Sequence, residues 1–159
     1  MIEIELSEDM VDECRPKANA IGRLNNSVTD GDGNLAGVVG EYVVHKYLNG
    51  STWENTFDYD LIYRDKKIDV KTKRTSVIPM PYYECSIYDQ STHQECDGYV
   101  FVRLMKDMSK AWILGGLSKE EYFKNALHHK EGEVDTDNDF TYPADCYNIS
   151  ISKLKQFKK

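Results

Sequence analysis

The segment at residues 58–73, DYDLIYRDKKIDVKTK, constrains the fold of this chain more than any other stretch. Its β-branched and aromatic residues predict two short strands, and the polar RDKK between them predicts the turn of a β-hairpin. With the central DK pair at the tip, Tyr63 is expected to pair with Ile68, and Leu61 with Val70. Because side chains alternate between the faces of a strand, these four residues predict a core face.

The charged residues of the hairpin fall on its other face. Asp69 and Lys71 share that face in any register, because they are two positions apart on one strand. Asp60 joins them if the connection has an even length, since a one-residue slip would move it to the opposite face. The hairpin therefore predicts two neighbouring carboxylates beside an ammonium group.

Two adjacent carboxylates repel each other unless a cation or a shared proton relieves them. Carboxylate oxygens are the ligands that hard divalent cations such as Mg2+ prefer. Glu41, in the apolar stretch LAGVVGEYVVHKYL at residues 35–48, is the best candidate for a third acid. Gly37 and Gly40 precede it and predict a helix that approaches a sheet closely.

Length and composition are those of a globular protein. The 159 residues are 40% hydrophobic and 30% charged, which predicts one domain over residues 1–159 with a buried core. The net charge of −7 argues against a generally basic nucleic-acid coat protein but leaves room for a local basic patch. No apolar run or N-terminal leader suggests a membrane span or secretion, so a cytoplasmic, intracellular protein is expected.

The N-terminal half predicts a strand followed by two helices. Residues 2–6 alternate like a short edge strand. Ser7 can cap the first helix, which Pro16 is expected to kink or end. The turn-rich stretch 25–34 predicts a loop before the apolar helix at 35–48.

The C-terminal half predicts more strands and one further helix. Two nearly continuous apolar runs at 98–104 and 111–116 predict central strands. A capping box formed by Ser118 and Glu121 opens a helix expected to run to residue 129. The stretch 132–139 predicts a polar loop. The chain is expected to end as a strand with a basic tail, giving an α/β domain with a small mixed sheet flanked by helices.

At this point the sequence resembles a family. The motifs GVVGEYVVHKYL and YDLIYRDKKIDVKTKR are similar to the core of the PD-(D/E)xK nuclease superfamily, with a motif core at about residues 35–104. That family places a Glu on the first core helix, an Asp on the next strand and a D/E-x-K triplet on the strand after. By position these are Glu41, Asp60 and the triplet from Asp69 to Lys71. Tyr59 stands where the motif has proline.

The resemblance implies a restriction-endonuclease-like fold and metal-dependent hydrolysis of DNA phosphodiester bonds, most simply by an endonuclease. Asp60 and Asp69 would hold one or two Mg2+ ions, for which Mn2+ would substitute, and Glu41 would complete the coordination. The metal would activate the attacking water and stabilise charge on the phosphoryl oxygens. Lys71 would position the water. A homodimer that presents two active sites to two strands is compatible with this scheme.

Basic residues near the same hairpin are candidates for contacts to nucleic-acid phosphates. A second basic set forms the tail, which is equally well explained as a solvated charge run. Tyr88 and the aromatics of PMPYYE could stack on bases, and Gln90 and Gln94 could add polar contacts. The hairpin set is Lys66, Lys67, Lys73 and Arg74, and the tail set is Lys153, Lys155, Lys158 and Lys159.

Two other metal sites compete with this interpretation. Asp30, Asp32, Asn34 and Glu41 occupy positions 1, 3, 5 and 12 of an EF-hand-like calcium loop, although Leu35 stands where the loop needs Gly. Cys85, His93 and Cys96 form a local cluster, but without the spacing of a structural zinc site. A third alternative needs no metal: a catalytically silent module of the same fold that binds DNA or a protein.

Overall fold

The computed structural model describes residues 1–22, 32–54, 56–137 and 139–158. Its main feature is a mixed six-stranded sheet with the strand order β1-β7-β6-β4-β3-β2, in which only β4 and β6 run parallel. The apolar runs predicted as central strands are β6 and β7, inside the sheet, and the predicted edge strand is β1. The strands are β1 (Ile2–Glu5), β2 (Thr52–Trp53), β3 (Leu61–Tyr63), β4 (Lys66–Thr75), β6 (Gly98–Met105) and β7 (Lys110–Ser118).

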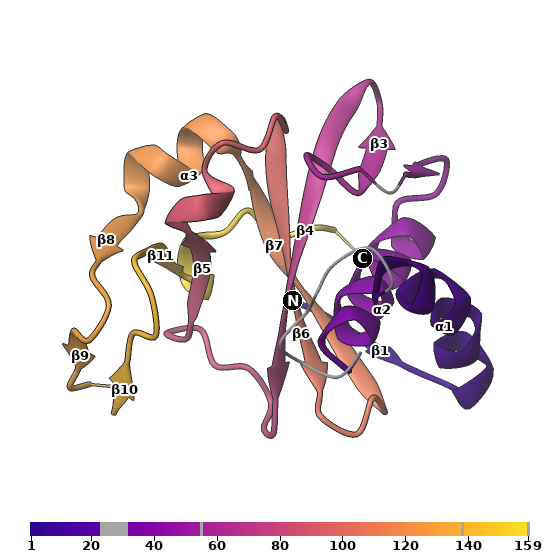
Figure 1. Ribbon diagram of the computed structural model, residues 1–159, viewed down its shortest axis with the longest axis horizontal. Helices are drawn as coiled ribbons and strands as arrows, with labels where there is room; N and C mark the ends of the chain where they lie inside the picture. The colour runs from indigo at the N-terminus through magenta and orange to yellow at the C-terminus, as the bar shows by residue number, and fades with distance from the viewer. Residues whose placement is uncertain (23–31, 55, 138, 159) are drawn as a thin grey trace.

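Helices α1 (Glu8–Gly22) and α2 (Asp32–Tyr47) lie together on one side of this sheet (Figure 1). Helix α2 packs directly on β4 and β6, and α1 packs on α2. The apolar core between them contains Val39 and Val43 from α2 and Leu61 and Val70 from the hairpin. The core face predicted for the hairpin is therefore confirmed.

The opposite side of the main sheet carries a second, three-stranded sheet with the order β5-β11-β8 (Figure 1). Helix α3 packs beside it, and Tyr99, Phe101 and Tyr122 lie in the aromatic core between the layers. The remaining elements are β5 (Glu84–Tyr88), η1 (Asp89–Ser91), α3 (Lys119–Asn125), β8 (Leu127–His129), β9 (Val134–Asp135), β10 (Phe140–Thr141), β11 (Cys146–Ser150) and η2 (Ile151–Lys153).

The hairpin turns more tightly than predicted. Tyr63 pairs with Lys66, and Leu61 with Ile68, so the expected pairing was wrong by two positions. The loop is the two-residue pair Arg64 and Asp65, with φ of 49° and 60°, which is the backbone of a type I′ hairpin turn. Because the shift is an even number of residues, it leaves every side chain on its predicted face.

Helix α2 approaches β4 closely at one glycine. A Cβ atom added to Gly40 would lie 1.9 Å from Oγ1 of Thr72, so only glycine allows this spacing. Nothing lies within 4 Å of the corresponding position on Gly37. The prediction of a close approach is confirmed for Gly40 and wrong for Gly37.

Several element boundaries differ from prediction. Helix α1 begins after Ser7, whose Oγ accepts a hydrogen bond from the Met10 amide, but continues past Pro16 to Gly22. The capping box at Ser118 and Glu121 is present, yet α3 ends at Asn125. The expected helical continuation forms β8 instead, because it pairs with β11. The expected loop at 132–139 contains β9, which pairs with β10.

Within the part of the chain that the structure describes, no helix is both long enough and apolar enough to cross a membrane.

Candidate functional site

The three predicted acids come from three separate elements of the structure. Glu41 lies on α2 and is 8% exposed, and Asp69 lies on β4 and is 4% exposed. Asp60 directly precedes β3 and is partly buried. Their charges influence one another: Glu41 and Asp69 both raise the pKa of Asp60, and Asp69 raises that of Glu41. The fold therefore brings these three side chains into one electrostatically coupled group.

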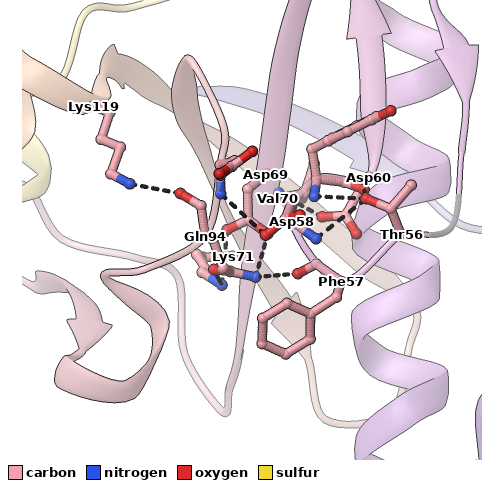
Figure 2. A network of polar contacts seen from close by, with 11 residues as sticks. Thr56, Phe57, Asp58, Asp60, Asp69, Val70, Lys71, Gln94 and Lys119 are labelled. Carbon is pink, nitrogen blue, oxygen red and sulfur yellow. Dashed lines mark hydrogen bonds and ion pairs between the residues drawn. The ribbon is translucent and has the colours of Figure 1, made fainter.

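Asp69, Lys71 and Gln94 are directed toward one another (Figure 2). The Lys71 Nζ atom lies 2.7 Å from Oδ2 of Asp69 and donates a hydrogen bond of 2.9 Å to Oε1 of Gln94. Nε2 of Gln94 in turn donates to the Phe57 carbonyl at 2.7 Å and reaches Oδ1 of Asp69 at 3.5 Å. The ammonium group is thus held between a carboxylate and a fixed amide.

Gln94 is itself buried, although it comes from the segment between η1 and β6. The backbone carbonyl oxygen of Gln94 accepts a hydrogen bond of 2.5 Å from Nζ of Lys119, at the start of α3. The adjacent Glu95 amide donates to Oδ1 of Asp58 at 3.1 Å. These contacts fix the segment against the residues that precede β3, and so fix Gln94 beside Lys71 (Figure 2).

Asp60 adopts a position that favours its protonated form. Burial, Glu41 and Asp69 together raise its pKa to about 8, in spite of a hydrogen bond of 2.7 Å from the Val70 amide to its Oδ2. A hydrogen bond also joins Asp60 to Asp69 and helps to stabilise ionised Asp69. The raised pKa favours a protonated Asp60 beside an ionised Asp69 at neutral pH, and a proton shared in this way is one of the two ways to relieve such a pair.

Glu41 is held at the edge of this group by residues that the sequence did not indicate. Its Oε2 atom accepts a hydrogen bond of 2.8 Å from Nε1 of Trp53 on β2 and lies 3.4 Å from Nζ of Lys17 on α1. The Lys17 ammonium also lies 3.7 Å from the centre of a Trp53 ring. Burial raises the pKa of Glu41, and these two partners oppose that shift.

The chemistry of this donor set fits a hard divalent cation. All three acids are desolvated, and burial is the largest cause of the raised pKa in each. Oδ2 of Asp69 is fully buried, and the Lys71 ammonium lies 2.7 Å from it. A bound cation would relieve the same repulsion that the shared proton now relieves.

The side chains as they stand do not yet converge on a single point. Among the residues described, no three His, Cys, Asp or Glu side chains form a group that could hold a metal ion. The geometry gives a reason, because Oε2 of Glu41 is engaged by Trp53 and Lys17. Asp60 and Asp69, which are joined by a hydrogen bond, are the closest approach to a two-acid site.

The basic residues named with the hairpin do not form one patch. Lys67, Asp69, Lys71 and Lys73 share a face of β4, whereas Lys66 and Arg74 lie on the other. The Lys66 ammonium lies 3.8 Å from Oδ1 of Asp97, and the Lys67 ammonium lies 5.2 Å from the Tyr59 ring centre. At the far end of β4, Arg74 donates to the Lys106 carbonyl at 3.2 Å. The set is therefore spread along the strand.

The basic tail is partly tied to the protein. The Lys155 ammonium pairs with Glu121, the Lys155 backbone pairs with Gly116, and the Lys158 carbonyl accepts a hydrogen bond from the Tyr47 hydroxyl. Lys159 lies outside the described residues.

Of the aromatic and glutamine residues predicted to contact nucleic acid, the fold brings Gln94 alone beside Asp69 and Lys71. Gln90 is exposed, as are Tyr82 and Tyr88, while Tyr83 packs against the aromatic core.

The calcium-loop interpretation is wrong for the three of its residues that the structure describes. Asp32, Asn34 and Glu41 all belong to α2, so they lie on a helix instead of in a loop. Asp30 lies outside the described residues.

The cysteine cluster also forms no metal site among the described residues. Cys85 is buried on β5 and Cys96 packs against the aromatic core, both as free thiols, while His93 is exposed. Burial raises the pKa of both thiols, and that of Cys85 reaches about 12. This is the behaviour of buried structural cysteines.

Compared with protein-family models and with curated protein sequences, the chain has no match.

Proposed function

We propose that this protein is a metal-dependent nuclease that hydrolyses phosphodiester bonds of DNA, built on a restriction-endonuclease-like core with a PD-(D/E)xK site. One observation carries the proposal: Glu41, Asp60 and Asp69, from three separate elements, form a buried and mutually repelling group beside the Lys71 ammonium. Perturbed carboxylates gathered in this way are typical of functional sites, because a fold gains no stability from them.

In this proposal Asp60 and Asp69 hold Mg2+, with Mn2+ as a substitute, and Glu41 completes the set when it leaves Lys17. Such an ion supplies charge neutralisation at the phosphoryl oxygens and a lowered pKa of bound water. Asp60 must lose its proton to serve as a ligand, so binding is expected to release that proton near neutral pH. Metal affinity should therefore rise with pH up to the pKa of about 8.

Lys71 has the role of positioning and electrostatic stabilisation. Its ammonium, fixed by Asp69 and Gln94, is placed to orient the attacking water and to offset charge that develops on the phosphate. Its side chain is 26% exposed, so one part of it remains accessible to a substrate. Lys67 and Lys73, on the same face of β4, would contact neighbouring phosphates, and Lys66 and Arg74 would approach from the other face.

A catalytically silent module that binds DNA or a protein is the second candidate. It is favoured by the engagement of Glu41 with Trp53 and Lys17, since these contacts satisfy the acid without a metal. In such a module the Asp69–Lys71 pair would be a structural ion pair. The two candidates differ in one observable, which is whether a divalent cation makes the protein cleave nucleic acid.

The deciding experiment is a cleavage assay with duplex, single-stranded and branched DNA and with RNA, in Mg2+ or Mn2+ and in EDTA. The proposal expects cleavage that requires the metal and that is lost in Asp69→Asn and Lys71→Ala. Lys124→Gln, an exposed lysine on α3, is the matched control and should cleave like the wild type. Absence of cleavage on every substrate, or equal cleavage by the two site variants, would favour the silent module.

A further inference from the structure

A second group of like charges lies on the same face of the main sheet, one step beyond Lys71. Lys73 on β4 and Arg103 on β6 are partners in the parallel ladder, so their side chains emerge side by side from adjacent strands. Such strands are about 4.8 Å apart, and like charges at neighbouring positions destabilise a sheet. The fold therefore holds two cations where packing alone would place apolar or oppositely charged residues.

No ion pair joins an acid to either cation among the described residues, although the nearby Glu84 opposes the shift of the Lys73 pKa. Arg103 is only 7% exposed and forms no ion pair; it donates one hydrogen bond, of 2.7 Å, to the Glu84 carbonyl oxygen. Lys73 forms no ion pair either, and its ammonium lies 4.7 Å from the centre of the Phe140 ring. Burial and the Arg103 charge both lower the pKa of Lys73. A guanidinium has five N–H donors, so Arg103 keeps most of its hydrogen-bonding capacity for another partner.

These two cations face a cavity between the two sheets. The cavity has a volume of about 180 Å³, and Lys71, Lys73 and Arg103 all line it, with Ser86 and Ser91 as hydroxyl donors. Glu84 is the one acid in its lining, and its carboxylate accepts a hydrogen bond of 2.7 Å from the Tyr142 hydroxyl. An adjoining cavity of about 230 Å³ is also lined by Lys73 and Arg103, together with the acids Glu84 and Asp135. The first cavity is thus lined by three cations, one acid and two hydroxyl donors, a balance that favours an oxyanion.

We propose that this cavity is an anion site that binds a phosphate group of a nucleic acid, next to the phosphate held at Asp69 and Lys71. The identity of the ligand rests on the proposed function, whereas the preference for an oxyanion rests on Lys73 and Arg103. Lys71 lines the cavity and also contacts Asp69, so it joins the two sites. It precedes Lys73 by two strand positions, roughly 6.6 Å, which leaves room for one phosphate beside each ammonium.

The test measures binding in EDTA, so that no cleavage is required. The probes are a short single-stranded DNA, followed by fluorescence anisotropy over a range of salt concentrations, and inorganic phosphate as a competitor. Lys73→Gln is expected to weaken DNA binding about tenfold and to reduce the salt slope by about one. Lys73→Arg should restore binding because it keeps the charge. Lys124→Gln, on exposed α3, should match the wild type.

Arg103 is buried, so its replacement is paired with a check of folding by circular dichroism and thermal unfolding. Folded Arg103→Lys should bind DNA more weakly than the wild type, and inorganic phosphate should displace DNA from the wild type more effectively than from Lys73→Gln. Equal DNA binding by wild type, Lys73→Gln and folded Arg103→Lys would overturn the anion site even if the wild type cleaves DNA. Weakened binding by Lys73→Gln, in a protein that cleaves nothing with Mg2+, would support the anion site and overturn the nuclease.

Discussion

Two regions along β4 each gather charges of one sign, an acid region around Asp60 and Asp69 and a cation region around Lys73 and Arg103. At one end, Asp60 and Asp69 are carboxylates that repel each other, and Glu41 adds to the repulsion. Further along the strand, Lys73 and Arg103 are adjacent cations. The acids are relieved internally by a shared proton, by Lys71 and by Gln94. Lys73 and Arg103 form no ion pair in the described part of the chain, although Glu84 lies near them.

The comparison shows what each region lacks. A fold selected for stability alone would bring acids and cations together, as at the sheet edge where Lys110 pairs with both Glu3 and Glu5. Here the acids and the cations form two separate groups, and the Lys71–Asp69 pair joins them. The acids need a cation and the cations need an anion. A phosphodiester accompanied by a divalent ion supplies both.

The largest expected effect concerns the residues that join the regions. Lys71→Ala and Asp69→Asn are each expected to lower metal-dependent cleavage by on the order of 10²-fold or more, because they remove charge that acts on the reacting phosphate. Single-turnover rates at saturating DNA would measure this. A loss of less than about threefold in both variants, with Lys124→Gln as the reference, would remove Lys71 and Asp69 from the mechanism.

Substitutions at two glycines of α2 test the group of acids separately from the group of cations. Gly40→Ala should destabilise the protein by about 1–3 kcal/mol, because its Cβ would overlap Oγ1 of Thr72 and displace Glu41 from β4. Gly37→Ala has open space and should be neutral or stabilising by up to about 1 kcal/mol. Urea denaturation measures both.

In folded Gly40→Ala, cleavage should fall while DNA binding in EDTA stays near the wild-type value, because Lys73 lies on the face of β4 opposite to Thr72, which contacts α2. Equal stability of the Gly37 and Gly40 variants would contradict the close contact.

Asp60 should make the protein less stable as the pH rises. Its pKa is about 8 in the folded protein, against an ordinary value of 3.8, so between about pH 4 and pH 8 the folded state binds more protons than the unfolded state. The free energy of unfolding therefore decreases with rising pH over that range. Asp60→Asn removes this dependence and should raise the melting temperature at pH 8 by roughly 2–4 °C, while it abolishes cleavage.

Thermal unfolding at pH 5 and pH 8 measures the difference, with the exposed Asp12→Asn as the control. Mg2+ should stabilise the wild type more at pH 8 than at pH 5. If Asp60→Asn were less stable than the wild type at pH 8, the ionised Asp60 carboxylate would not be destabilising the folded protein.

The smallest expected effect concerns Lys17. Its ammonium lies 3.4 Å from Oε2 of Glu41 and competes with any cation for that oxygen. Lys17→Gln should therefore strengthen Mg2+ binding by a few-fold, on the order of 0.5–1 kcal/mol. Isothermal titration calorimetry in the absence of DNA measures it. Weaker Mg2+ binding in this variant would mean that Glu41 takes no part in holding the ion.

The sequence predicted the hairpin faces because strand alternation depends only on parity, and the two-residue error in pairing preserved it. It also predicted α2 and the two central strands, whose apolar runs are long and continuous. It missed β5 as a strand, because two prolines and a mixed polar stretch masked the pattern, although β5 pairs with β11 far along the chain. Strand β5 lines the cavity faced by Lys73 and Arg103.

The partners of the acids were largely beyond the reach of sequence patterns. Lys17 and Trp53 contact Glu41 only because α1 and β2 pack beside α2, and neither residue has a local signal. Gln94 could be suspected from its polarity, yet its contact with Lys71 depends on the path of a loop that separates β5 from β6. Arg103 lies in an apolar strand, where a buried cation is itself the signal that could have drawn attention.

The most direct test of the account is the location of a divalent ion in crystals soaked with Mn2+. We expect an anomalous peak between Asp60 and Asp69, within coordination distance of an oxygen from each, with Glu41 moved away from Lys17. A peak at any other place, or no peak at these residues in crystals grown above pH 8, would contradict it.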